Sequence, residues 1–108
     1  MRSYDDILTD VCVAFDSNIE TFNNRGDKRV NEHMSLINQA FILIAMNTFC
    51  TNLTILAKYL KRSPASVSVA YQKAQMLARS QNPYAINFKE RVMNSCEEGK
   101  KLIKEQYS

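Results

Sequence analysis

The chain has 108 residues, of which 45% are hydrophobic and 23% are charged, a balance typical of one globular domain and not of a disordered segment. Only two glycines and two prolines occur, which disfavours the many turns of a strand-rich fold. The formal net charge is +3, and it is unevenly distributed: residues 1–54 carry −3 and residues 55–108 carry +6. Positive charge therefore concentrates in the second half of the chain.

The cysteines and the N-terminal stretch argue against a secreted, metal-binding or membrane protein. Cys12, Cys50 and Cys96 are odd in number and widely spaced, and His33 is the only histidine. We therefore expect reduced thiols, with neither a disulfide framework nor a zinc site. Acidic residues interrupt the first stretch, unlike a signal peptide, and the most apolar run, 40–45, is too short to span a bilayer. We expect a cytoplasmic protein with no cofactor, no metal and no membrane partner.

The first half of the chain predicts helices on either side of a basic loop. Ser3 is a good N-cap for a first helix, whose apolar residues recur at helical spacing up to Phe15, and 19–22 forms at most one further turn. Residues 30–48 predict a long helix that is apolar nearly all round in its second half, so we expect it to be the buried central helix. The polar loop between them carries Arg25, Lys28 and Arg29.

Two shorter helices follow, with the sharpest boundary of the sequence between them. Asn52 predicts the start of a helix over 53–61. Ser63 then caps the next helix, and Pro64 occupies its first position, where a backbone N–H would have no helical partner.

The chain closes with one more predicted helix. Asn82-Pro83 ends the preceding helix, because the residue before proline avoids the α region. An amphipathic helix then covers about 84–106, in which Gly99 costs about 1 kcal/mol relative to alanine. Together these elements predict an all-α bundle of five to six helices that forms a single domain over residues 1–108.

The two short helices have the pattern of a helix-turn-helix between Asn52 and Gln72. Ala57 is small enough to let the helices approach, and Val67 and Ala70 would lock the second helix across the first. Such a second helix lies in the major groove of DNA with its N-terminal residues at the base edges. Besides the loop residues Arg25, Lys28 and Arg29, the residues expected to meet DNA are Lys58, Lys61, Arg62, Ser63, Ala65, Ser66, Val69, Gln72 and Lys73.

Three segments resemble the C-terminal DNA-binding domain of the bacterial replication initiator DnaA, and still more the small stand-alone proteins that carry only this domain. They are Gln39-Ala40-Phe41, the run from Asn52 to Ala57, and the ungapped run from Leu60 to Ala70. The resemblance implies a DnaA domain IV or Trp-repressor-like bundle that carries the helix-turn-helix at 52–72. It also implies that a basic side chain of the loop enters the minor groove, while Arg62 and the residues after it read the major groove and the backbone.

This chain departs from the family at the residues that read bases. Arg62 matches the family's arginine, but Ser63 and Pro64 stand where the family has Asp and then His or Arg, and Ala65 and Ser66 replace two threonines. Small side chains of this kind make few bidentate base contacts, so we expect modest sequence preference. The chain also lacks the glycine-rich phosphate loop of an ATPase.

Two functions fit these patterns. The first is binding of double-stranded DNA by an accessory or regulatory protein of replication or transcription that has no ATPase activity. The second is a protein-interaction module that keeps the DnaA-like fold and has lost DNA binding, which the replaced residues and the acidic N-terminal half favour. We do not expect an enzyme, because one histidine without a nearby cysteine and without a phosphate loop leaves little catalytic machinery.

Overall fold

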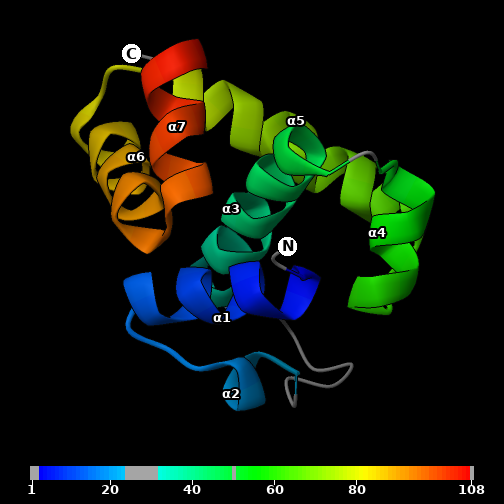
Figure 1. Cartoon of the computed structure of the whole chain (residues 1–108). Helices are drawn as coiled ribbons and strands as arrows, with labels where there is room; N and C mark the ends of the chain where they lie inside the picture. Colours follow the sequence, from blue (N-terminus) through cyan, green and yellow to red (C-terminus); the bar gives the residue numbers. More distant parts are fainter. Residues whose placement is uncertain (1–2, 24–31, 50, 108) are drawn as a thin grey trace.

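The computed structural model describes residues 3–23, 32–49 and 51–107, and within these ranges the chain forms seven helices and no strand (Figure 1). The helices are α1 (Tyr4–Ala14), α2 (Ile19–Asn23), α3 (Glu32–Thr48), α4 (Leu53–Leu60), α5 (Pro64–Arg79), α6 (Pro83–Ser95) and α7 (Glu97–Gln106). The predicted all-α class is confirmed. The predicted count of five to six helices is wrong, because the segment expected to form one C-terminal helix forms two.

Helix α3 is the centre of the bundle, as its composition predicted. All residues from Ile37 to Ala45 are buried, and α1, α5 and α7 pack against this helix. Figure 1 shows α3 running through the middle, with α6 and α7 on one side and α4 on the other. Phe15, Phe41 and Phe88 join the core, whereas Tyr4 is only partly buried. Burial of so much apolar surface is the main force that holds the helices together.

The start of α1 is fixed by a reciprocal cap. The Oγ of Ser3 accepts a hydrogen bond from the amide of Asp6 at 3.2 Å, and Oδ2 of Asp6 accepts one from the amide of Ser3 at 2.9 Å. This arrangement satisfies two backbone donors at the helix start, and it confirms the predicted N-cap. The hydroxyl of Tyr4 donates to Oγ1 of Thr51 at 2.6 Å, so the first turn of α1 is also tied to the segment before α4.

A second tie between α1 and α4 joins Tyr59 to Asp5. The hydroxyl of Tyr59 donates a hydrogen bond to Oδ1 of Asp5, while its ring lies 5.2 Å from the ring of Tyr4 and 5.6 Å from that of Phe41. Burial, followed by the hydrogen bond and the charge of Asp5, raises the pKa of Tyr59 above its usual 10.0. The folded protein therefore favours the protonated phenol.

This raised pKa predicts that alkali weakens the fold. A group whose pKa is raised by folding stabilises the folded state fully below its unfolded pKa and loses that contribution as the pH rises further. We expect the free energy of unfolding to fall above about pH 10, and to fall less steeply in Tyr59→Phe, which already lacks about 1 kcal/mol at neutral pH. Urea denaturation of both proteins at about pH 8 and about pH 11 measures the difference. Equal losses in the two proteins would contradict the role of Tyr59.

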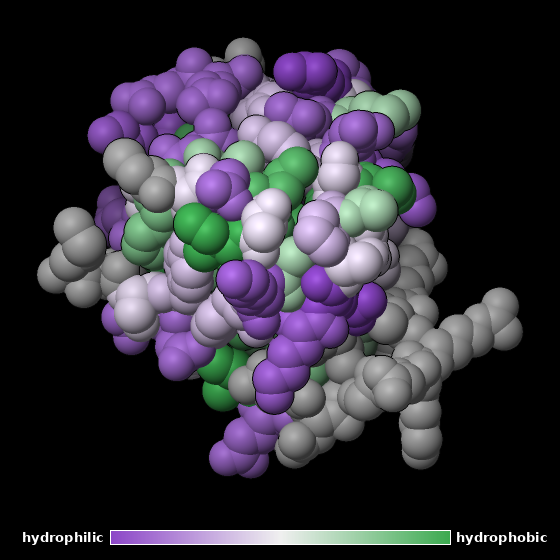
Figure 2. Space-filling view, turned by 90° about the vertical axis from the view of Figure 1, so that its right-hand side faces the viewer, coloured by the Kyte–Doolittle hydropathy of each residue, from purple (hydrophilic) through white to green (hydrophobic). Residues whose placement is uncertain are grey.

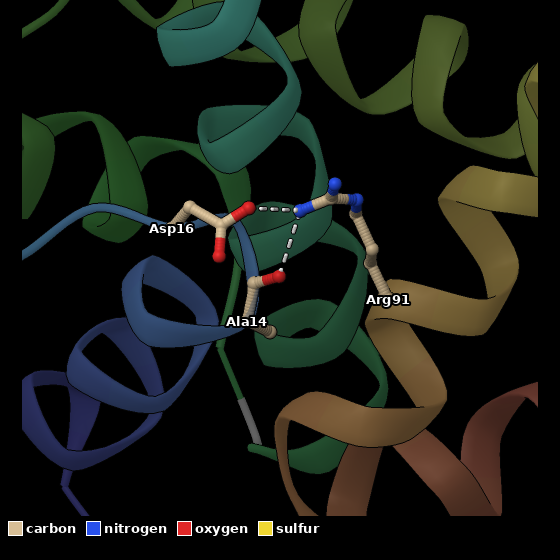
Figure 3. A network of polar contacts seen from close by, with 3 residues as sticks. All are labelled: Ala14, Asp16 and Arg91. Atoms are coloured by element: carbon tan, nitrogen blue, oxygen red, sulfur yellow. Dashed lines mark hydrogen bonds and ion pairs between the residues drawn. The ribbon is translucent and has the colours of Figure 1, made fainter.

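The C-terminal end of α1 is held by an arginine from α6 (Figure 3). Nη1 of Arg91 donates to the carbonyl oxygen of Ala14 at 3.0 Å and to Oδ2 of Asp16 at 3.2 Å, and its guanidinium lies 5.5 Å from the centre of the Phe15 ring. Asp16 has φ 59°, a left-handed conformation that Asp tolerates better than most residues. Arg91 thus satisfies a carbonyl that α1 leaves without a helical partner.

The break between α6 and α7 corrects the prediction of one helix over 84–106. Cys96 has φ −165° and ψ 168°, so the chain is extended there, and its Sγ accepts a hydrogen bond from the amide of Gly99 at 3.4 Å. Gly99 is buried in the first turn of α7. A Cβ atom at this position would collide with the carbonyl oxygen of Val92 and lie 3.1 Å from Oγ of Ser95. Gly99 therefore permits the close approach of α6 and α7, and the expectation that it only weakens a helix is wrong.

The break expected at Asn82-Pro83 is present, but these residues begin α6. Helix α5 ends at Arg79, where Ser80 forms the C-cap. Oδ1 of Asn82 accepts a hydrogen bond from the amide of Ala85 at 2.8 Å, and Pro83 occupies the first position of α6. This is the arrangement predicted for Ser63-Pro64, repeated one helix later.

Candidate nucleic-acid interface

Helices α4 and α5 are joined by a short turn at residues 61–63 and pack against each other. Oδ1 of Asn52 accepts a hydrogen bond from the amide of Ile55 at 3.0 Å, and Oγ of Ser63 accepts one from the amide of Ser66 at 3.2 Å. Both predicted N-caps are thus confirmed, with Pro64 at the first position of α5. The buried face of α4 carries Ala57 between Leu56 and Leu60, which is where the predicted small residue was expected.

Lys61 lies outside α4, which corrects the predicted end of this helix by one residue. Its φ of 58° and ψ of 46° are left-handed, and the next amide, that of Arg62, donates to the carbonyl oxygen of Ala57 at 2.9 Å. Helices commonly end in this way, with glycine at the left-handed position, because a Cβ atom there is strained. The chain therefore keeps a lysine where the backbone favours glycine.

We expect Lys61→Gly to raise the free energy of unfolding by about 0.5–1 kcal/mol, because glycine adopts this conformation without the steric cost. Lys61→Ala removes the same charge but keeps the Cβ atom, so it should leave stability nearly unchanged. Urea denaturation followed by circular dichroism separates the two variants. A stability gain of equal size in both would mean that the charge of Lys61, and not its backbone, is unfavourable.

The predicted DNA-contacting residues of α4 and α5 lie on the surface. Figure 2 shows the side of the molecule that carries α4, where hydrophobic residues gather near the middle among hydrophilic ones. Val69 is 51% exposed, and Arg62 is partly buried. The other exposed members of the predicted set are Lys58, Lys61, Ser63, Ala65, Ser66, Gln72 and Lys73. The loop residues Arg25, Lys28 and Arg29 lie outside the described residues, so the structure brings together only the α4–α5 part of the predicted site.

A polar cavity of about 300 Å³ lies between α3 and α5, beside the turn. Its described lining contains two cations, Arg62 and Lys73, and no carboxylate. The remaining lining residues are Ser35, Asn38 and Gln39 of α3 and Ser66, Val69 and Ala70 of α5. We call this cavity the Arg62 pocket. Its composition suits an anionic group, which two cations attract and several hydroxyl and amide groups surround.

Two polar atoms of the Arg62 pocket are buried without a hydrogen-bond partner among the described residues. They are Oδ1 of Asn38, whose side chain is only 8% exposed, and Nε of Arg62. Gln39, also 8% exposed, donates from Nε2 to Oγ of Ser35 at 3.1 Å. Burying a polar group without a partner costs about 1–3 kcal/mol. Nε of Arg62 can donate a hydrogen bond to an anionic ligand, whereas Oδ1 of Asn38 can only accept one and would need a donor.

Asn38 lines the Arg62 pocket but is not among the predicted DNA-contacting residues, and Gln39 was singled out only through the resemblance. Both are polar residues in the otherwise apolar run of α3 from Ile37 to Ala45. Polar side chains within a buried segment are the signal that was available in the sequence, because such side chains are rarely buried unless they form hydrogen bonds. The sequence does not show that Asn38 and Gln39 face α5, because this depends on how α5 crosses α3.

The fold and the site define an all-α protein with a cationic surface around the turn between two packed helices. Within the described ranges, no three His, Cys, Asp or Glu side chains gather as metal ligands would, and none of the described helices combines the length and apolar character needed to cross a bilayer. Comparison with protein-family models, with curated proteins and with solved structures finds no match to this chain.

Proposed function

We propose that the chain binds double-stranded DNA through α4 and α5 acting as a helix-turn-helix, as an accessory or regulatory protein of replication or transcription. The observation that carries this proposal is the exposed face at the start of α5, formed by Pro64, Ala65, Ser66 and Val69, together with the basic residues of the preceding helix end and turn, Lys58, Lys61 and Arg62. The resemblance of Leu60 to Ala70 to the DnaA C-terminal domain supports it. The basic loop at 25–29 would add a second contact, in the minor groove.

In this proposal α5 enters the major groove with its N-terminal end leading. Backbone phosphates are held by Arg62 and Lys73, and the positive end of the α5 dipole adds to the attraction. Ala65 and Ser66 are too small to read bases by paired hydrogen bonds. Affinity then comes chiefly from phosphates, and sequence preference comes from DNA shape and from van der Waals contacts such as those of Val69.

Fluorescence anisotropy with a labelled duplex tests the proposal. Binding is expected at about 50 mM salt and should weaken at about 200 mM, with log K falling by about 0.9 per decade of salt for each phosphate contact. A single-stranded oligonucleotide of the same length serves as the matched probe for duplex geometry. Failure to bind any duplex at low salt would overturn the proposal.

A further inference from the structure

A second cavity, of about 360 Å³, adjoins the Arg62 pocket. The two share Ser35, Gln39 and Lys73, so they lie side by side along the contact between α3 and α5. The second cavity is more apolar than the first, since besides the three shared residues and Ser80 it is lined by Leu36, Met76, Leu77 and Tyr84. We call the two cavities together the α3–α5 groove.

The apolar part of this groove is open to solvent. Met76 is 69% exposed and Tyr84 is 48% exposed, whereas Leu36 and Leu77 are partly buried and pack against the core. DNA offers little to such a surface, because its only large apolar group at a groove edge is the thymine methyl. Methionine, by contrast, is frequent at surfaces that bind protein segments, because its flexible side chain adapts to an apolar partner.

The groove has the length of a short peptide. It extends along α5 from Ser66 to Ser80, which at the rise of an α-helix is about 21 Å. About four helical turns, or about six extended residues, cover this distance. A partner segment of that size would reach both the apolar and the cationic part.

The charge of the groove selects among partners. The described lining of both cavities contains Arg62 and Lys73 but no acidic side chain. An acidic segment is therefore attracted, and a basic one is repelled or left with unpaired charges.

We infer that the α3–α5 groove binds an acidic, amphipathic segment of a partner protein. An apolar anchor of the segment packs among Leu36, Met76 and Tyr84, and its carboxylates pair with Lys73 and Arg62. This inference does not depend on DNA binding. If the chain also binds DNA, the two ligands compete for Arg62 and Lys73, and the partner acts as an inhibitor.

Three synthetic helical peptides of about 14 residues test the inference by nuclear magnetic resonance titration. The first has leucine and phenylalanine on one face and glutamate on the other. The second has lysine in place of every glutamate, and the third has alanine in place of every apolar anchor. We expect only the first to shift the resonances of Leu36, Met76 and Tyr84. Absence of binding by the first peptide, binding of the second or the third equal to that of the first, or shifts confined to another face would overturn the inference.

A variant with a matched control locates the contact. Met76→Glu places a charge in the apolar part of the groove and should weaken the first peptide by at least about tenfold. Val13→Glu is the control, because Val13 is 65% exposed on α1 and lines neither cavity. Circular dichroism checks that both variants are folded. Equal affinities of Met76→Glu and Val13→Glu would overturn the proposed site even if the peptide binds.

The peptide and DNA experiments test separate claims, so a negative result in one does not affect the other. Peptide binding without duplex binding retains this inference and overturns the proposed DNA function. Duplex binding without peptide binding retains the proposed DNA function and overturns this inference. If both bind, an excess of the first peptide should displace the duplex, and simultaneous binding would overturn the shared use of Arg62 and Lys73.

Discussion

Replacement of Gly99 by alanine is expected to lower the free energy of unfolding by about 1–3 kcal/mol, because the added methyl group meets the backbone of α6. The collision is with the carbonyl oxygen of Val92, which belongs to the helix backbone and cannot rotate away as a side chain would. Urea denaturation followed by circular dichroism measures the change.

The sign of this effect separates two accounts of Gly99. If the residue were only a weak point in one continuous helix, alanine would stabilise the protein by about 1 kcal/mol. Lys100→Ala is the matched control, since Lys100 is the next residue of α7 and is exposed. We expect the control to change stability by less than about 0.5 kcal/mol. Stabilisation by Gly99→Ala would contradict the close packing of α6 on α7.

Replacement of Arg62 by alanine is expected to weaken duplex binding by about tenfold or more and to reduce the salt slope by about 1, if the proposed function holds. Arg62 lies in the turn between α4 and α5, and it is one of the two cations that line the Arg62 pocket. Arg62→Lys keeps the charge but loses the planar group with its buried Nε, so it should recover the salt slope and only part of the affinity.

Anisotropy titrations of the wild type and the two variants at several salt concentrations make this measurement. Lys100→Ala again provides a control, because it removes one positive charge from α7, outside the proposed interface. If Lys100→Ala weakens binding as much as Arg62→Ala, attraction depends on net charge alone, and no specific role of Arg62 remains.

Local signals predicted the start of most helices but not how the helices meet. Ser3, Asn52 and Ser63 cap helices as expected, because a cap depends on residues within one turn. Asn82-Pro83 carries the same signal as Ser63-Pro64, yet it was interpreted as a stop. A proline after a capping residue favours a helix start as much as a helix end, so the pattern alone is ambiguous.

The C-terminal break was missed because its cap is unusual. Cysteine is a weak hydrogen-bond acceptor and is seldom expected as an N-cap, so Cys96 gave no clear signal. Glu97 and Glu98 in the first turn of α7 were the available signal, since acidic residues favour a helix N-terminus. The role of Gly99 depends on α6, and nothing within one turn of the sequence reveals it.

The candidate site also has one part that local sequence signals predicted and one part that they did not. The exposed face of α5 followed from helical periodicity, which places Ser66, Val69 and Lys73 on one side. The Arg62 pocket and the apolar part of the groove were not predicted, because they join α3 to α5 across more than 20 residues of chain. Such pairs are decided by packing, which leaves no periodic pattern in the sequence.

The contact of Arg91 with Ala14 and Asp16 has a consequence for synthesis of the chain. Asp16 and Arg91 are 75 residues apart in the sequence. At ordinary elongation rates, the ribosome therefore adds Arg91 roughly 4–15 s after it adds Asp16. During that interval α1, which packs on both α3 and α6 in the folded protein, has no α6 to pack against. Nascent chains stalled before α6 should therefore bind chaperones and be cleaved readily in α1, and chains that include Arg91 should resist both.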